Sequence, residues 1–196
     1  MASEDEEFTM LFQDFYPSLC RFLECLLGGR APLAQDLAQE SFLQLHRTAW
    51  GTMPVGEARF WLYRVARNMA INEFRKSNTR YRLFDRVVEV MRPRARNPEQ
   101  EYETQERNTM VLEILQTLPE DQRTALLLRE QEQLSYREIG QVLNISESKV
   151  KVDIFRARAA LRERWNRMSG ISRSSHKDAK VQTPYLSLRA LAAKSQ

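Results

Sequence analysis

Residues 134–161 read LSYREIGQVLNISESKVKVDIFRARAAL, and this stretch predicts two short helices joined by a tight turn. Ser135 and Glu138 have the spacing of a capping box, in which each side chain satisfies a free backbone N–H at the start of a helix. Gly140 leaves room for a close approach between the helices, and Asn144 begins the turn. The stretch therefore predicts a helix-turn-helix unit.

The second helix of this unit has two different faces. It starts after Ser146, a suitable N-cap. One face carries an apolar stripe at helical spacing, formed by Val150, Ile154, Ala157 and Leu161. The opposite face carries small, basic and apolar side chains: Ser148, Lys149, Lys151, Val152, Phe155 and Arg156. A helix of this kind suits a DNA major groove. The alternative is an ordinary helical hairpin with a solvated basic face.

The composition bounds the class of protein. A chain of 196 residues suits one or two small domains, and a hydrophobic content of 42% is enough for their cores. No apolar run approaches the roughly 20 residues that a membrane span needs. The N-terminus, MASEDEEF, is acidic and lacks the basic-then-apolar order of a signal peptide. We therefore expect a cytoplasmic protein without membrane insertion.

No group of residues predicts catalysis. Cys20 and Cys25 are five positions apart among apolar residues, which favours buried free thiols over a disulfide framework. His46 and His176 are too far apart in the chain to suggest a metal site or a catalytic triad. The sequence predicts no catalytic residue, no metal and no cofactor, and we expect a protein that is not an enzyme.

Charge is unevenly distributed along a chain whose formal net charge is +4. Lys and Arg clearly outnumber Asp and Glu in residues 59–96 and again in residues 147–167, whereas the first thirty residues are acidic. Two separate basic zones predict two contacts with a polyanion.

The N-terminal part predicts helices with one apolar face. Residues 6–27 form one helix or a pair of helices interrupted by Pro17, and Gly28-Gly29 ends them. Residues 32–50 form a further helix whose outward face carries Asp36, Gln39, Glu40, Leu43 and Arg47. This face is either a solvated surface or a docking site for a basic helix of a partner.

A loop over residues 51–57 leads into a helix over residues 58–76, with an unusual flank. Trp61, Asn68 and Asn72 share this flank, beside Arg64, Arg67, Ile71 and Arg75. Aromatic, amide and guanidinium groups together can stack an unpaired base and hold its backbone. Alternatively, Trp61 completes the core, as we expect for Tyr63.

The pattern predicts an all-α fold of two small helical domains joined by a flexible linker. The first domain spans residues 1–76, the linker residues 77–104 and the second domain residues 105–167. A helical piece is possible within the linker around residues 83–91. Residues 168–196 are basic and rich in Ser at their start, which predicts a mobile tail.

Four segments carry a family resemblance. They read DLAQESF (36–42), FWLYRVARNMAINEFR (60–75), LPEDQRTALLLRE (118–130) and LSYREIGQVLNISESKVK (134–151). In this order, on both sides of a linker, they resemble a bacterial RNA polymerase sigma factor of the extracytoplasmic-function (ECF) class of the sigma-70 family. The resemblance covers about residues 8–166.

The resemblance implies a role for each outward face. The clamp helices of the largest subunit of core RNA polymerase would dock on Asp36, Leu37, Gln39, Glu40, Phe42 and Leu43. The loop 51–59 would capture a flipped-out base of the minus-ten element, and the helix after it would hold the melted strand through Trp61, Arg64, Arg67, Asn68, Asn72 and Arg75. The minus-thirty-five element would be read by Ser148, Lys149, Lys151, Val152, Phe155 and Arg156. The family also implies an anti-sigma factor as a partner.

Two residues depart from the family pattern. Val152 stands where a small hydroxyl residue is usual and can touch a thymine methyl group, and Asp153 replaces a common arginine. Asp153 projects toward the core side of its helix, where it can pair with a neighbouring arginine. A dimeric helix-turn-helix regulator without polymerase docking is the alternative function, and an adaptor without promoter activity is a third.

Overall fold

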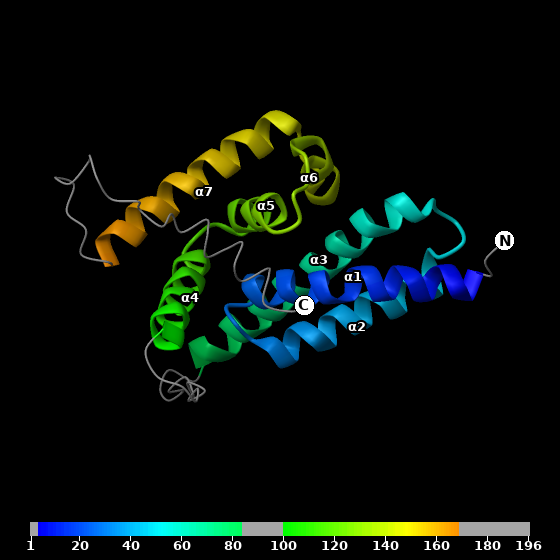
Figure 1. Ribbon diagram of the computed structural model, residues 1–196, viewed down its shortest axis with the longest axis horizontal. Coiled ribbons are helices and arrows are strands. Elements are labelled where there is room, and N and C mark those ends of the chain that lie inside the picture. The colour runs from blue at the N-terminus through cyan, green and yellow to red at the C-terminus, as the bar shows by residue number, and fades with distance from the viewer. Residues whose placement is uncertain (1–3, 84–99, 169–196) are drawn as a thin grey trace.

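The computed structural model describes residues 4–83 and 100–168, and within these ranges the chain is entirely helical apart from turns and loops (Figure 1). The helices are α1 (Glu4–Leu26), α2 (Ala31–Thr48), α3 (Val55–Leu83), α4 (Gln100–Gln116), α5 (Glu120–Glu130), α6 (Tyr136–Leu143) and α7 (Glu147–Met168). This confirms the predicted all-α class. None of the helices in the two described ranges has the length and apolar character to cross a membrane.

Helices α1, α2 and α3 pack on one another and form the first domain. Their apolar stripes meet in a core whose largest fully buried side chains include Leu19, Phe22, Leu23, Leu45 and Leu62. Pro17 is exposed and lies inside α1, so the predicted interruption does not split this helix into two. Gly28 and Gly29 have φ of 70° and 89°, a backbone conformation that glycine adopts without strain, and they turn the chain toward α2.

Helices α4 to α7 form the second domain, with α5, α6 and α4 all packed against α7. The apolar stripe predicted on α7 is buried, from Val150 to Leu161. It meets α4 and α5 in a core that contains Ile114, Leu126 and Leu127. This packing fixes α7 on its scaffold and turns its opposite face outward.

The helix-turn-helix unit has the local geometry that its sequence predicts. Ser135 and Glu138 form the reciprocal capping box at the start of α6, and Asn144 ends α6 in the left-handed conformation with φ of 55°. A Cβ atom at Gly140 would lie 2.8 Å from the carbonyl oxygen of Ile145, so glycine allows the turn to close against α6. The hydroxyl of Ser146 accepts the Lys149 N–H at 3.3 Å and caps α7.

The helices flanking the predicted linker are longer than expected. Residues 77–83 continue α3, and residues 100–104 already belong to α4. Neither Gly nor Pro occurs between Gly56 and Pro93, so nothing in the chain stops α3 where its apolar period fades. The helical piece expected after Leu83 and the predicted tail after Met168 lie outside the described residues.

The two domains pack against each other as well, in what we call the closed arrangement. Helix α3 contacts α6, and α1 contacts α4 and α5. The side chains of Gln116 and Arg123 donate hydrogen bonds to the backbone carbonyl of Leu26, at 3.3 and 3.4 Å. These contacts satisfy carbonyls at the end of α1 that have no partner within the helix.

Candidate nucleic-acid and protein interfaces

The outward face of α7 combines cations with exposed apolar side chains. Phe155 is 74% exposed and Val152 is 44% exposed, because Val150, Ile154 and Ala157 take the buried side of the helix. The remaining predicted residues of this face are also exposed: Ser148, Lys149, Lys151 and Arg156. Helix α7 therefore exposes the predicted set of side chains.

Asp153 lies on the core side of α7, as its helical position predicts. It is 4% exposed, and its carboxylate accepts a hydrogen bond from the Nζ of Lys149 at 2.5 Å. The partner is therefore a lysine one turn earlier, not an arginine. A carboxylate in this position faces away from the exposed basic face of α7 and would repel a phosphate there less than an outward one.

The flank of α3 contains both exposed and buried side chains, whereas its sequence pattern predicts that all of them face outward. Arg64, Asn68, Asn72 and Arg75 are exposed. Ile71, expected beside them, is buried at 5% exposure. The helix turns by 100° per residue, which carries this position toward the core side.

The start of α3, the loop before it and Gln141 of α6 line a solvent-open cavity of about 450 Å³. Its walls include Met53 and Pro54 of the loop, the rings of Phe60 and Trp61, and the side chain of Arg64. Trp61 is half-buried and packs against the core as well as lining this pocket, and its stacking on a base stays a prediction. Tyr63 is a core residue, as predicted. Aromatic walls with a guanidinium beside them can hold a planar base.

The predicted docking face of α2 divides into exposed and buried parts. Asp36, Gln39 and Leu43 are exposed, and Leu43 stands out at 48%. Leu37 and Glu40 are half-buried. Phe42 was expected to contact the polymerase, but the structure places it in the core, where it is 2% exposed. Its ring packs edge-on against that of Phe12, with ring centroids 4.9 Å apart. Its inward position in the helical period sets it beneath the predicted docking face.

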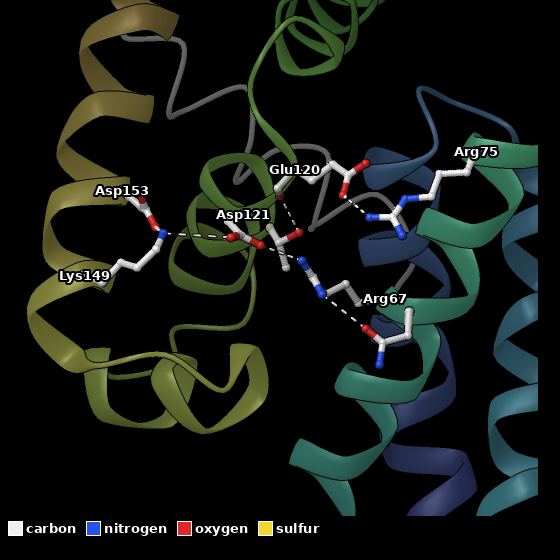
Figure 2. Close-up of polar contacts among 8 residues, drawn as sticks. Arg67, Arg75, Glu120, Asp121, Lys149 and Asp153 are labelled. Atoms are coloured by element: carbon white, nitrogen blue, oxygen red, sulfur yellow. Dashed lines mark hydrogen bonds and ion pairs between the residues drawn. The ribbon is translucent and has the colours of Figure 1, made fainter. Parts of the chain in front are cut away.

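Acidic residues at the start of α5 hold the arginines of α3, as Figure 2 shows. The Nη2 of Arg67 lies 2.6 Å from the Oδ1 of Asp121, and the Nη2 of Arg75 lies 3.6 Å from the Oε2 of Glu120. Sequence reasoning missed these contacts, because Pro119-Glu120-Asp121 is fully accounted for as a helix start. The excess of Arg in α3 is the one signal that could have suggested an acidic partner within the chain.

A buried tyrosine-glutamate contact joins the domains near the middle of α3. The hydroxyl of Tyr63 donates to the carboxylate of Glu132 at 2.5 Å. Burial raises the pKa of Glu132 above its ordinary value, and burial together with this carboxylate holds the pKa of Tyr63 well above its own. The phenol therefore stays a neutral donor.

The residues that the structure describes include neither an activated thiol nor a cluster of metal ligands. Cys20 and Cys25 are free, and burial raises the pKa of Cys25 to about 12, which keeps its thiol protonated and unreactive. The described residues contain no group of His, Cys, Asp and Glu side chains that could hold a metal ion.

Comparison with known proteins assigns both domains to one class. Residues 11–80 match the family model of sigma-70 region 2, and residues 108–161 match that of sigma-70 region 4. The chain is 31% identical to the ECF RNA polymerase sigma factor SigM of Bacillus subtilis over 166 residues, which are 83% of this chain and 95% of that protein. It is 38% identical to the RNA polymerase sigma-H factor of Pseudomonas aeruginosa over 138 residues, covering 65% of this chain and 70% of the relative.

A solved structure shares the fold. The sigma factor RpoE of Bartonella quintana, crystallised with the anti-sigma factor NepR, aligns with a TM-score of 0.60 at 20% identity, over 81% of this chain and 96% of that one.

The two matched regions define a sigma factor, a non-enzymatic initiation factor of bacterial transcription. The chain belongs to the ECF sigma factors of the sigma-70 family. It directs RNA polymerase to promoters for transcription initiation, with core polymerase and promoter DNA as its partners. This membership argues against the dimeric regulator, which would not dock on polymerase.

Proposed function

We propose that three faces of this sigma factor divide the work of initiation between them. The face of α2 docks on core polymerase, the start of α3 with its cavity captures and holds the melted minus-ten strand, and the outward face of α7 reads the minus-thirty-five element. The observation that carries the proposal is the aromatic cavity before α3, because a reader of duplex DNA alone has no use for a pocket that fits a single base.

The cavity supplies a way to open the duplex without nucleotide hydrolysis. Extracting one base from the stack costs a few kcal/mol. Stacking of that base on an aromatic ring such as Trp61 is worth about 1–3 kcal/mol, which can offset the cost. Asn68 and Asn72 lie exposed further along the same helix, where their amides can bond the next bases of the strand.

The face of α7 suits direct reading in the major groove. Val152 and Phe155 offer apolar contacts to thymine methyl groups, while Lys151 and Arg156 can neutralise phosphates or reach guanine. The exposure of a phenylalanine at 74% costs apolar burial in the free protein, and a DNA contact would recover it.

The face of α2 suits a basic helix of the polymerase. Asp36 and Glu40 lie one turn apart, and Leu43 adds an exposed apolar contact beside them. The proposed partner is the pair of clamp helices of the largest subunit. We further propose that the protein works in the cytoplasm and that an anti-sigma factor covers this face when initiation is held back.

Run-off transcription tests the proposal as a whole. Purified core polymerase would transcribe a library of genomic fragments with and without the protein. Discrete new start sites that share two sequence elements upstream are the expected result. If core polymerase binds the protein but no new starts appear, the chain is an adaptor without promoter activity and the proposal is wrong.

A further inference from the structure

One lysine of the outward face of α7 is engaged within the second domain. The Nζ of Lys149 lies 2.5 Å from the Oδ2 of Asp153, one turn later in α7, and 3.8 Å from the Oδ2 of Asp121 at the start of α5 (Figure 2). Asp153 is 4% exposed, and a buried carboxylate that loses its cation is strongly unfavourable. Lys149 therefore cannot turn to a DNA phosphate without leaving a buried charge unpaired.

The helical period sets Lys149 apart from the centre of the outward face. A helix turns by about 100° per residue, so Val152 and Phe155 lie about 60° apart around the axis of α7. Lys149 lies about 60° from Val152 in the other direction, toward the side of the buried Asp153. The centre of the face is a line of exposed, uncharged side chains: Ser148, Val152, Phe155 and Ala159.

Cations flank this uncharged centre on both sides. Lys151 lies on one side, where its Nζ is 2.8 Å from a carboxylate oxygen of Glu147. Both side chains of this pair are exposed, and such pairs are weak enough for Lys151 to exchange its partner for a phosphate. Arg156 lies on the other side, and no carboxylate among the described residues pairs with it. A helix in the major groove with such a face would meet phosphates with its flanks and base edges with its centre.

The uncharged centre of α7 can recognise one feature of the major groove. Val152 and Phe155 neither donate nor accept hydrogen bonds, so they cannot read the polar edges of guanine, cytosine or adenine. Thymine alone among the four bases adds a methyl group to the groove. A polar base edge opposite these side chains would lose its water without gaining a partner, which adds a penalty to the missing attraction.

We infer that the 5-methyl groups of thymines facing Val152 and Phe155 select the minus-thirty-five element, and that Lys149 positions α7 without contacting DNA. The inference rests on the proposed function of α7. Val152 and Phe155 determine the specificity. Lys149 neutralises Asp153 and ties α7 to the start of α5, so that these two side chains are held at the centre of the outward face.

Replacing thymine by deoxyuridine tests the methyl contact, because it removes the methyl group and keeps the base pair. The probes are duplexes of the upstream element found by run-off transcription, with thymine or deoxyuridine in that element alone. Holoenzyme should bind the deoxyuridine duplex about fourfold more weakly for each methyl group that loses its contact. The same replacement outside both promoter elements is the control and should change nothing. Equal affinities for the thymine and deoxyuridine elements would overturn the inference.

Variants of α7 assign the methyl contact to its side chains. Val152→Ser and Phe155→Leu should each bring the ratio of the two affinities closer to one, because each variant loses apolar surface against a methyl group. A lower ratio in either variant supports the inference and assigns a methyl group to that side chain. A wild-type ratio in both variants would show that the methyl groups are read elsewhere, and the inference would be wrong.

Two neutralised ion pairs of α7 test the role of Lys149. Lys149→Gln with Asp153→Asn and Glu147→Gln with Lys151→Gln each remove one lysine and one carboxylate one turn apart, so the net charge is unchanged. The second double variant should lower the slope of log affinity against log salt by about one, because it loses a phosphate contact. The first should keep the wild-type slope. An equal fall of the slope in the first variant would make Lys149 a DNA contact and contradict its positioning role.

Transcription separates this inference from the function beneath it. Wild-type holoenzyme that initiates at discrete sites but binds the thymine and deoxyuridine elements equally overturns the inference and leaves the sigma function standing. Holoenzyme that initiates nowhere contradicts the proposed function itself, and the inference fails with it.

Discussion

Among the residues that the structure describes, helices α3 and α7 each carry a basic face, and the two faces differ in where their cations find partners. On α7, Lys151 pairs with Glu147 one turn away on the same helix, at 2.8 Å, and the face stays exposed. On α3, Arg67 pairs with Asp121 of the other domain and is largely covered. Pairing within a helix leaves a binding face open, whereas pairing between domains closes it. The exposed face of α7, proposed to read the minus-thirty-five element, is thus more accessible in this structure than the flank of α3 proposed to hold the minus-ten strand.

Loss of polymerase docking should have the largest effect, because this sigma factor acts by directing RNA polymerase to promoters. Asp36→Lys combined with Glu40→Lys reverses the charge of the α2 face, and we expect affinity for core polymerase to fall by about 100-fold or more. Binding to immobilised core polymerase measures this. Asp14→Lys with Glu113→Lys, two exposed acids elsewhere, is the charge-matched control. Equal losses for both double variants would refute the docking face.

Trp61→Ala tests the face of α3 that the second domain partly covers. Stacking on this ring is worth about 1–3 kcal/mol, so the rate of open-complex formation should fall by about tenfold or more, while binding of closed duplex by the holoenzyme stays nearly unchanged. Permanganate reactivity of unpaired thymines measures opening. A comparable loss in duplex binding would show that α3 does not act through a melted strand.

Phe155→Ala tests the exposed face of α7, and we expect the opposite result: duplex binding is lost while opening is kept. Loss of an apolar base contact should weaken duplex binding by the holoenzyme roughly tenfold and leave the opening step, once bound, unaffected. Fluorescence anisotropy with duplexes carrying altered upstream elements measures it. Arg162→Ala, an exposed cation further along α7, serves as the control for general charge effects. If Phe155→Ala binds as well as the wild type, the ring does not read DNA.

The smallest expected effect is a dependence of the stability of the closed arrangement on pH. Burial raises the pKa of Glu132 above the ordinary value of 4.5, against the opposing influence of Tyr63, Arg21 and Arg59. A separated, solvated Glu132 ionises first as the pH rises, so the closed arrangement loses stability from about pH 4.5 through the raised pKa and then stays constant. Glu132→Gln should abolish this component. The radius of gyration across this pH range is the measurement, and an identical profile for the variant would contradict the assignment.

Local signals made the helix-turn-helix unit predictable almost residue by residue. The capping box at Ser135, the left-handed turn at Asn144 and the inward position of Asp153 each depend on neighbours within a few positions. Such neighbours are visible in the sequence, and the helical period predicts which side chains face the core. The family signature then supplied the functional class.

Contacts between distant residues could not be predicted in the same way. The carboxylate of Asp121 satisfies every rule for a first-turn residue of α5, and nothing in its neighbourhood points to Arg67, 54 positions earlier. Phe42 shows the reverse problem: it belongs to a functional segment by resemblance, yet its place in the helical period sends it to the core. The length of α3 was underestimated because an apolar stripe can end before its helix does.

The internal pairing of Arg67 has a consequence for a protein that must find polymerase among a vast excess of chromosomal DNA. Bare cations are drawn to any phosphate backbone, and each such contact adds to binding that ignores sequence. A genome offers millions of these decoy sites. Because Asp121 neutralises Arg67, we expect the free chain to be less attracted to the chromosome than a chain with this arginine bare, and more of it to remain available to polymerase.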